Sequence, residues 1–457
     1  MSLFDTLGAG LSGLSVASAG LQTTTHNVTN ASTHGFTRRA VQIGTRDPVF
    51  RRGVWLGQGA QVGQITRASD AFALGRLLTT TGHASSAAAE HSALVAFEGL
   101  FEPSSGVSLR QSVDEIFDAL QGATADPSDQ GFRLDVLSSL ETFTSTVNRI
   151  GSTLEQGISE RSTTVEGSIV EVNAMLAEVA SLNFQVQSAG GALAAGDLAD
   201  RRDELIGALA DTVGATVFYE RDGTATVRLG GHAAVSGGSA RTVGLSADGG
   251  TLTLSVDDGV VDLNGEIGGR LGGELVGRSR LESWLSDLDQ LVTDLAGALN
   301  AQNTAGFTPT GAAGGALFTL PAAGSVSAGL KLDPGVQDNP FALAFAANAT
   351  GEAGDGGNLT AFIALESAPL VGGAQTVGAF ATRLTGRVGS ETALAASAAE
   401  STESSRLDAE ELFSSLTGVN LDEEAVRLVQ YQAAYQAAAK VIQVTDETLD
   451  ALMRIAS

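Results

Sequence analysis

Apolar residues recur at alternating steps of four and three through the C-terminal stretch 419–457. The seam defined by these steps comprises Leu421, Ala425, Leu428, Gln432, Tyr435, Ala439, Ile442, Asp446, Leu449 and Met453. This heptad rhythm predicts a long helix with one face packed on a partner helix. Asn420 provides an N-cap, and three acids follow in the first turn, where the helix dipole favours negative charge. Gln432 and Asp446 are the polar seam positions, and we expect them to set the register of the pairing.

A second heptad runs through residues 3–28 and is rich in small residues. Its seam comprises Leu3, Leu7, Gly10, Leu14, Ala17, Leu21, Thr24 and Val28. Two end helices with the same period suggest that the termini pair with each other, because helix stability comes mostly from packing an apolar face. Two independent amphipathic helices docked on a core fit the period equally well, so both interpretations stay open at this point.

Between the two ends, most of the chain has helical periodicity. The turn formers Asn27, Asn30 and Gly35 stop the first helix, and residues from Phe36 onward are predicted to be extended. Glycine-punctuated alternation over 53–67 predicts a short hairpin. The helical segments that the apolar stripes indicate are 110–122, 130–188, 197–214, 270–302, 359–372 and 376–417.

The pattern changes to period two after residue 214. Asp222 and Gly223 stand between two alternating runs, which is a strong hairpin signal. Residues 215–265 are therefore interpreted as a small β domain inserted in a mainly α chain, an α+β fold class. Residues 303–357 are rich in Gly, Ala and Pro and are predicted to form loops or short strands.

These patterns predict both ends at one place and the middle far from it. Residues 1–40 and 419–457 form a terminal coiled-coil hairpin in this interpretation. A helical, rod-like domain of bundle legs is expected from 41–214, 266–302 and 358–418, with the 53–67 hairpin near its start.

Composition narrows the class of protein. The chain has 457 residues and a net charge of -26, which argues against binding nucleic acid or anionic lipid. It contains no cysteine, so disulfides and thiolate metal sites are excluded. The start has no basic n-region and no continuous apolar core, and no apolar run is long enough for a bilayer, so we expect no cleaved signal peptide and no membrane insertion.

No stretch carries the chemistry of an active site. None of the five histidines has the spacing of a zinc helix, and the stretches 268–277 and 371–380, interpreted as turns, lack the lysine of a phosphate loop. Acid pairs are expected by chance among 52 acids, and two Trp and three Tyr are too few for a sugar-binding cleft. We therefore expect no catalytic residue, no metal and no cofactor.

Both ends of the chain resemble those of the bacterial flagellar axial proteins, which include rod, hook and hook-associated proteins. The N-terminal motif is NVTNASTHGFTRR (27–39), with Asn27, Asn30, Thr33, Gly35, Phe36, Arg38 and Arg39. The C-terminal motif is Val419 to Glu424, followed by Tyr431 to Ala437 and Leu449 to Ile455. Within that group, the middle resembles the hook-associated protein 1 family at 97–106, 197–205, 268–275 and 299–307.

The resemblance implies a structural protein of the hook–filament junction, added as a ring of copies at the distal end of the hook. It implies secretion by the flagellar type III route, with hook protein, a second junction protein and neighbouring copies as partners, and an export chaperone on the C-terminal helix. A hook or rod subunit is the alternative with the same ends. A secreted enzyme or adhesin on an axial scaffold would need a binding site in 215–357.

The resemblance also indicates which residues make assembly contacts. On the N-terminal side these are Leu3, Leu7, Leu14, Leu21, Asn27, Asn30, Gly35 and Phe36. On the C-terminal side they are Leu421, Leu428, Tyr431, Gln432, Tyr435, Ile442, Asp446, Leu449 and Met453. Tyr431 and Tyr435 are four residues apart, which fits either the core of the helix hairpin or a seam between subunits.

Overall fold

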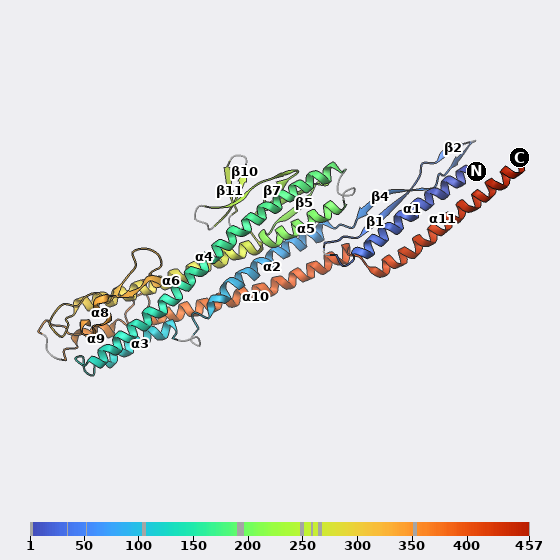
Figure 1. Ribbon diagram of the computed structural model, residues 1–457. Coiled ribbons are helices and arrows are strands. Elements are labelled where there is room, and N and C mark those ends of the chain that lie inside the picture. Colours follow the sequence, from blue (N-terminus) through green and yellow to red (C-terminus); the bar gives the residue numbers. More distant parts are fainter. Residues whose placement is uncertain are drawn as a thin grey trace.

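The protein is an elongated, mostly helical molecule with both termini at one end (Figure 1). The computed structural model describes residues 3–33, 35–51, 53–102, 107–189, 196–246, 251–256, 259–263, 267–350 and 354–456. The mainly α fold with an inserted β domain is confirmed. Residues 103–106, part of the 97–106 stretch that carried the resemblance, lie outside the described residues.

The helices and strands are as follows. The α-helices are α1 (Leu3–Asn30), α2 (Ala71–Glu98), α3 (Leu109–Gly122), α4 (Gln130–Ser188), α5 (Gly196–Val213), α6 (Gly269–Ala305), α7 (Val326–Gly329), α8 (Pro334–Gln337), α9 (Gly357–Ala364), α10 (Val377–Thr417) and α11 (Leu421–Ala456). The strands are β1 (Arg39–Thr45), β2 (Val49–Arg51), β3 (Val54–Leu56), β4 (Ala60–Arg67), β5 (Thr216–Tyr219), β6 (Ala225–Leu229), β7 (His232–Ser236), β8 (Ser239–Ala240), β9 (Val243–Leu245), β10 (Leu252–Val256), β11 (Gly259–Asp262), β12 (Phe318–Thr319) and β13 (Lys331–Leu332). A 3-10 turn spans Pro340–Ala342.

Four long helices, α2, α4, α6 and α10, form the rod (Figure 1). Helix α4 is a single 59-residue helix that begins at the N-cap Asp129, whose carboxylate accepts from the amides of Gly131 and Phe132. It contributes to both hydrophobic cores: its first half packs with α3, α6, α9 and α10, and its second half with α5 and the β domain. The long helical run predicted over 130–188 is confirmed.

The inserted domain consists of two antiparallel sheets, β5-β6-β7-β8 and β11-β10-β9. The turn between β5 and β6 contains Gly223 at φ 87, a left-handed conformation that favours glycine. Asn183 of α4 anchors this domain, because its side-chain amide donates to Ala225 O and its oxygen accepts from Ala225 N, both at 2.8 Å. The hairpin predicted at Asp222-Gly223 is confirmed.

The hairpin near residue 60 differs from the prediction. Strand β4 pairs with β1, from Arg39↔Arg67 to Thr45↔Ala60, and only the short β2 and β3 pair within the stretch between them. This long hairpin, which we call the 39–67 hairpin, packs on α1. The expectation of a short hairpin confined to 53–67 and belonging to the rod is therefore wrong. Alternation alone does not show which strand is the partner.

The glycine-rich stretch 268–277 is also not a turn. Gly268 is the N-cap of α6 and the remaining residues form its first turns. A Cβ on Gly273 would meet Ser86 O and Ala89 Cβ of α2, and one on Gly277 would meet Ala93 Cβ. The glycines therefore allow α2 and α6 to approach closely, a packing role that sequence alone does not separate from a turn. In the other stretch, Gly372 and Gly373 do form a turn before α10.

Residues 303–357 form loops and short strands as predicted, and they also contain two short helices and a 3-10 turn. Strands β12 and β13 pair from Phe318↔Leu332 to Thr319↔Lys331, and α7, α8 and the 3-10 turn are each about one turn long. Buried Arg133 of α4 holds this region, donating to Leu343 O at 2.7 Å and to Pro340 O at 3.4 Å.

Helices α1 and α11 form an antiparallel pair at the terminal end (Figure 1). Glycines of α1 face side chains of α11: a Cβ on Gly10 would lie 3.0 Å from Ile442, one on Gly13 3.6 Å from Ala438, and one on Gly20 2.5 Å from the Tyr431 ring. The absence of these Cβ atoms lets the two backbones approach and leaves room for the larger side chains of α11. The pairing of the two ends of the chain is confirmed.

The seam on α11 is only partly the one expected. The more buried positions are Glu424, Arg427, Leu428, Tyr431, Ala438, Ala439, Ile442, Thr445 and Leu449, of which Leu428, Ala439, Ile442 and Leu449 were predicted. Gln432 and Asp446 are exposed, as are Leu421, Met453 and, less strongly, Tyr435. The idea that Gln432 and Asp446 set the register within this pair is therefore wrong. Alanines occur on several sides of α11, so more than one set of heptad positions can pack closely on a partner helix. The glycines of α1 determine which of these sets faces α1.

The seam on α1 is partly as expected. Gly10, Ala17 and Thr24 are buried, Leu3, Leu7, Leu14 and Leu21 are partly buried, and Val28 is exposed. A second face of α1 meets the 39–67 hairpin: Ser12 Oγ accepts from Ala60 N at 3.2 Å. Because α1 has two neighbours, its small residues face α11 and its leucines lie at the margins.

We predict that Gly20→Ala weakens the terminal pair and Gly8→Ala does not. Alanine at either position favours the helix by up to about 1 kcal/mol. At Gly20 the new methyl group overlaps the Tyr431 ring, whereas nothing lies within 4 Å of a Cβ at Gly8. Overpacking should cost about 1–3 kcal/mol, visible as faster amide hydrogen exchange in α1 and α11. Equal exchange in the two variants would contradict the close packing.

Candidate functional site: the joint between the terminal helices and the rod

Three chain segments meet where the terminal pair and the 39–67 hairpin join the rod: 31–38 between α1 and β1, 68–70 between β4 and α2, and 418–420 between α10 and α11. They bond to one another through the backbone of Arg38. Its amide donates to Thr417 O at 3.0 Å, and its carbonyl accepts from Ala68 N at 2.8 Å. We call this region, with the side chains that surround it, the joint.

Asn27, in the last turn of α1, holds the joint from the side of the terminal pair. Its side chain pairs with the backbone of Arg39: Nδ2 donates to Arg39 O at 2.8 Å, and Oδ1 accepts from Arg39 N at 2.9 Å. The second Nδ2 proton is donated to Glu424 Oε2 at 3.0 Å. A single buried amide thus joins the end of α1, the start of β1 and the start of α11.

Glu424 is the buried acid at the centre of this arrangement. Its side chain is only 1 % exposed and accepts from Arg38 Nε at 2.9 Å. Neighbouring Glu423 is 58 % exposed and lies 3.6 Å from the same guanidinium group. Asn420 begins the helix that carries both acids, since its Oδ1 accepts from the amides of Asp422 and Glu423. A buried carboxylate is tolerated because it is paired and hydrogen-bonded.

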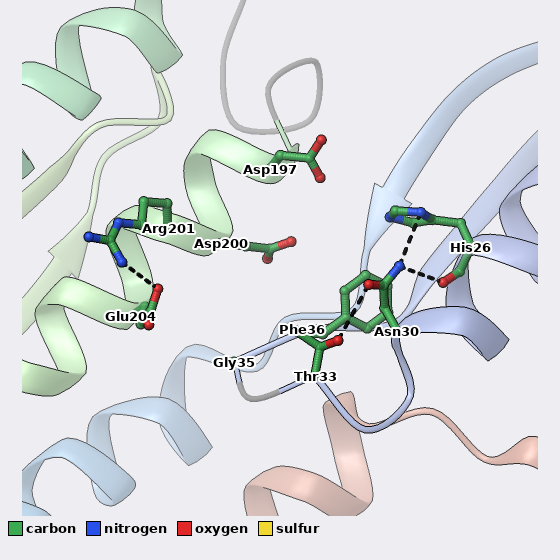
Figure 2. Close-up of a pocket in the computed structure, with 9 residues that line it drawn as sticks. All are labelled: His26, Asn30, Thr33, Gly35, Phe36, Asp197, Asp200, Arg201 and Glu204. Atoms are coloured by element: carbon green, nitrogen blue, oxygen red, sulfur yellow. Dashed lines mark hydrogen bonds and ion pairs between the residues drawn. The ribbon is translucent and has the colours of Figure 1, made fainter.

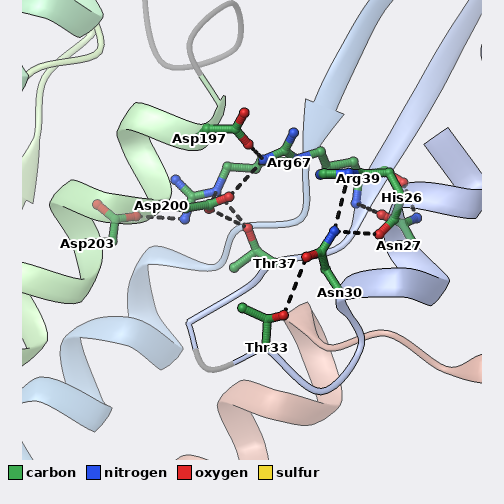
Figure 3. A network of polar contacts seen from close by, with 10 residues as sticks. All are labelled: His26, Asn27, Asn30, Thr33, Thr37, Arg39, Arg67, Asp197, Asp200 and Asp203. Atoms are coloured by element: carbon green, nitrogen blue, oxygen red, sulfur yellow. Dashed lines mark hydrogen bonds and ion pairs between the residues drawn. The ribbon is translucent and has the colours of Figure 1, made fainter. Parts of the chain in front are cut away.

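On the side of the rod, α5 presents three acids to two arginines of the 39–67 hairpin (Figure 3). Asp197, Asp200 and Asp203 are three residues apart, which places them on one face of the helix. Arg39 Nη2 lies 2.5 Å from Asp197 and 2.9 Å from Asp200. Arg67 lies 3.0 Å from Asp200 and 2.7 Å from Asp203. The two arginines, which are paired with each other at one end of the β1–β4 register, thus bridge consecutive acids.

Further contacts reinforce the acid row. Thr37 Oγ1 accepts from Arg67 Nε at 2.7 Å and donates to Asp200 Oδ1 at 3.1 Å. The hydrogen bond and charge of Arg39 hold the pKa of Asp197 below its usual range, although burial acts slightly in the other direction. Asp197 and Asp200 therefore join the hairpin to the rod through charge-assisted bonds.

The polar network continues to the β domain. Asp203 accepts from the Tyr219 hydroxyl of β5 at 2.8 Å. Arg202, buried beside it, donates to Gly223 O at 2.7 Å and to Asn183 Oδ1 at 3.2 Å. The β domain and the 39–67 hairpin are thus held by successive residues of one helix, α5.

A pocket of about 230 Å³ opens between the end of α1 and the start of α5 (Figure 2). Its lining residues are His26, Asn30, Thr33, Gly35, Phe36, Asp197, Asp200, Arg201 and Glu204. Asn30 Nδ2 donates to His26 O at 2.9 Å, and the His26 and Phe36 rings meet edge to face at 5.3 Å. Gly35 has φ 76, which reverses the chain after α1. The predicted residues Asn30, Gly35 and Phe36 are thus brought together.

The joint has the chemistry of a structural connection. Asp197, Asp200 and Glu204 are each bound by an arginine, and within the described ranges no three His, Asp or Glu side chains are grouped to hold a metal ion. Arginine–carboxylate pairs of this kind fix orientation through geometry.

Sequence reasoning found part of this site. The N-terminal residues Asn27, Asn30, Gly35 and Phe36 lie at the joint, whereas the predicted leucines and tyrosines lie along the pair. Glu424, Arg67 and the acids of α5 were missed as joint residues. The threefold spacing of the acids in DLADRRDEL was the available signal, but nothing in the sequence shows which arginines they meet.

We predict that Glu424→Ala loosens the start of α11 and that Glu423→Ala does not. Removing the buried partner takes away the closest carboxylate of Arg38 and the acceptor of one Asn27 Nδ2 proton, which should cost about 3–5 kcal/mol. Removing the exposed partner should cost at most about 1 kcal/mol. Hydrogen exchange of residues 421–428 distinguishes the two variants. Equal protection in both would show that Glu424 does not hold the joint.

We also predict that Asp200→Asn frees the angle between the terminal pair and the rod more than Asp197→Asn does. Asp200 binds both arginines and is 16 % exposed, whereas Asp197 binds one and is 84 % exposed. Small-angle scattering should show a broader distribution of molecular shapes for Asp200→Asn. Adding one molar salt to the parent protein should broaden its distribution of molecular shapes less than the substitution does, because salt screens partly buried ion pairs weakly. The reverse order of the two variants would refute the central role of Asp200.

Two family models match the chain. The model of the flagellar hook-associated protein FlgK helical domain matches residues 94–318. The model of the flagellar basal body rod FlgEFG protein C-terminal region matches residues 413–455, which include α11 and the C-terminal side of the joint.

Curated relatives agree with these models. Flagellar hook-associated protein 1 of Escherichia coli is 28 % identical over 68 % of this chain and 59 % of the relative. The Salmonella typhimurium protein of the same name is 27 % identical over 68 % of this chain and 58 % of its own length. The chain thus spans just under three fifths of these relatives. With flagellar hook-associated protein 1 of Bacillus subtilis it shares 26 % identity over 96 % of this chain and 95 % of the relative.

A solved structure shares the fold. The flagellar hook junction protein FlgK from Burkholderia pseudomallei matches with a TM-score of 0.63 over 74 % of this chain and 99 % of that chain, at 14 % identity. The helical-domain model in the middle, the rod-type model at the C-terminal end and relatives of one name agree with one another: the chain is similar to the flagellar hook-associated protein 1 family.

Proposed function

We propose that the chain forms the junction between hook and filament of a bacterial flagellum, assembling as a ring at the distal end of the hook. The observation that carries this proposal is the combination of the helical-domain match over 94–318 with a terminal helix pair whose outer surface is apolar. The first is the likeness to the family, and the second is a surface suited to assembly.

The terminal region is unusually apolar on its outside. Among the described residues, more than half of the large apolar side chains that are exposed lie on α1, α11 and the 39–67 hairpin, which make up less than a quarter of the chain. Exposed apolar surface concentrated in one region marks an interaction site. Other copies of the chain are the proposed partners of this surface.

Helix α11 contributes most to that surface. One face packs on α1, and the opposite face carries a second series of exposed apolar residues: Val426, Val429, Ala433, Ala437 and Val444. A helix that is apolar on both sides is buried on both sides in its functional state. The predicted assembly residues Leu421, Tyr435 and Met453 are exposed and available for the same contacts, and so are Gln432 and Asp446.

The remaining partners and the route of export follow from the family and stay proposals. We infer contacts with hook protein on one side and with a second junction protein on the other. We also infer export without a cleaved signal peptide, with a cytoplasmic chaperone covering α11 before assembly. None of the helices that the structure describes combines the length and apolarity needed to cross a membrane.

A structural role rather than an enzymatic one fits the joint. Its arginines and acids bind one another, and its relatives are named as hook-associated proteins. We propose that the ion pairs set the angle at which the terminal pair leaves the rod, so that neighbouring copies present their surfaces in the same orientation.

A hook or rod subunit is the second candidate. The match of residues 413–455 to a model of rod proteins supports it, because α11 is the part that would pack in either assembly. The helical-domain match over 94–318 favours the junction.

We predict that immunogold labelling places the protein in one narrow band between hook and filament. In cells whose only copy lacks residues 421–457, the rod domain should remain folded, with cooperative thermal unfolding, and filaments should be absent, because α11 provides the apolar outer face. Labelling along the whole hook would favour the hook or rod alternative. Normal filaments in the truncated strain would refute the assembly role of α11.

A further inference from the structure

One line of exposed residues on the solvent side of α4 carries no charge. Its members follow one another at steps of three and four, and we call them the α4 stripe: Gln156, Ser159, Thr163, Gly167, Val170 and Ala174. Such spacing places side chains on one side of a helix. Val170 is 69 % exposed, and the same side of α4 continues to Phe184, which is 63 % exposed. The solvent side of a surface helix normally carries charged and polar residues, so exposed Val and Phe on an uncharged line indicate a further packing surface.

Helix α10 carries a similar line. Its exposed members, which we call the α10 stripe, also follow at steps of three and four: Gly386, Ser390, Ala393, Ser397, Ser401 and Ser404. Leu394 lies beside this stripe and is 70 % exposed. Small side chains lose little conformational freedom when a partner covers them, and an uncharged line leaves no buried charge to be compensated. Both stripes are therefore suited to close packing of helices.

The two stripes lie at the same level of the rod. A Cβ on Gly157 of α4 would meet the Phe97 ring of α2, and one on Gly389 of α10 would lie 3.7 Å from Oε1 of Glu98, the next residue of α2. Both α4 and α10 run toward the joint (Figure 1). Because Gly157 and Gly389 share a level, the α4 stripe is level with the α10 stripe to within about one turn of helix.

The stripes also lie on opposite sides of the molecule. Helix α4 packs on α6, α6 on α2 and α2 on α10. Toward the joint, Figure 1 shows α4 along one side of the rod and α10 along the other. Each stripe is on the side of its helix away from the buried residues, such as Ile169 in α4 and Val388 in α10. One molecule thus presents two small, uncharged helix faces outward from opposite sides at one level.

We propose that the α4 stripe of one copy packs on the α10 stripe of the next copy. The inference rests on the proposed function and names a contact between neighbouring rods in the ring. Because the two stripes differ, the contact is heterologous, and repetition of a heterologous contact generates rings or helical arrays rather than twofold dimers. Because the stripes share a level, neighbouring rods stand side by side with little shift along their length.

A second copy is the partner that presents the matching stripe at the matching level. The size of the contact shows how it acts. The α10 stripe is about 27 Å long and, at the width of one helix, offers about 300 Å² per copy. A standard interface buries about 800 Å² per partner, so this contact does not hold two free copies together. It adds to the apolar surface of α11, which follows α10 directly in the chain.

Cross-linking between copies tests the contact, because the chain contains no cysteine. One pool of chains carries Val170→Cys. A second pool, with a size tag, carries one of Ser397→Cys, Ser401→Cys or Ser404→Cys, which are near the level of Val170. The pools are co-expressed in cells without their own copy, and isolated hooks with attached chains are mildly oxidised. A disulfide forms only where the two Cα atoms come within about 7 Å.

We expect a mixed cross-linked dimer for at least one α10 position. It should exceed by about tenfold or more the yield with Val260→Cys, which replaces an exposed side chain of the β domain, because contact raises effective concentration by orders of magnitude. Cross-links between Val170→Cys chains alone would overturn the proposal in favour of symmetric pairing through α4. Equal yields at Val260 and on α10 would overturn it as well.

Failure of this inference is distinguishable from failure of the proposed function. Chains that label a narrow band at the hook tip but give no mixed dimer retain the function and refute the packing of the two stripes.

For cysteine chains that do not assemble, Ala174→Glu provides a second measurement, with Val260→Glu as its control. Both side chains are exposed in the isolated protein, so the unfolding temperature should be unchanged in both variants. A charge in the α4 stripe should lower the number of filaments per cell severalfold, because the contact would bury it without a partner. The control should leave that number unchanged. Normal filament numbers with Ala174→Glu, or an equal fall in both variants, would overturn the packing.

Discussion

The buried carboxylate of Glu424 is the interaction on which the arrangement of the two halves of the molecule depends. It is withdrawn from water and satisfied by Arg38 and Asn27, so the first turn of α11 keeps its place only while the end of α1 and the following loop keep theirs. A buried charge without its partners is costly, which makes the three elements order together. The terminal pair and the rod are thus joined by polar contacts, in contrast to the apolar cores within the rod.

This division between apolar interior and polar connection has a mechanical consequence. Apolar packing tolerates small displacements, whereas a row of arginine–carboxylate pairs has one favourable geometry. Asp197, Asp200 and Asp203 repeat every three residues along α5 and meet Arg39 and Arg67, the paired first and last residues of the 39–67 hairpin. The same helix binds the β domain through Arg202. Helix α5 therefore orients both the terminal pair and the β domain relative to the rod.

Small residues have the complementary role in the helices. Glycines on α1 admit the side chains of α11, and glycines on α6 admit the backbone of α2. Each of these glycines weakens its own helix in isolation. The length of the helices and their close packing offset this loss of helix stability. The 59-residue α4 connects the two hydrophobic cores. A chain with few aromatic residues builds a long rod in this way.

The sequence by itself determined the elements that periodicity encodes. The long helix at 130–188, the hairpin at Asp222-Gly223, the mainly α class and the helices at both ends follow from local repeats, because apolar spacing is a property of one segment at a time. The turn after α1 was also predicted, since a cluster of turn formers such as Asn30 and Gly35 favours the end of a helix.

Only the tertiary structure decided which surfaces meet. Alanines on several sides of α11 left two heptads possible, and the glycines of α1 chose the one with Tyr431 over the one with Gln432. Strand β4 alternates as any edge strand does, and its partner β1 was identified only by folding. Glu424 looked like one of three helix-start acids, and its burial became visible only beside Arg38. In each case the deciding contact joins residues far apart in the chain, which a local pattern does not contain.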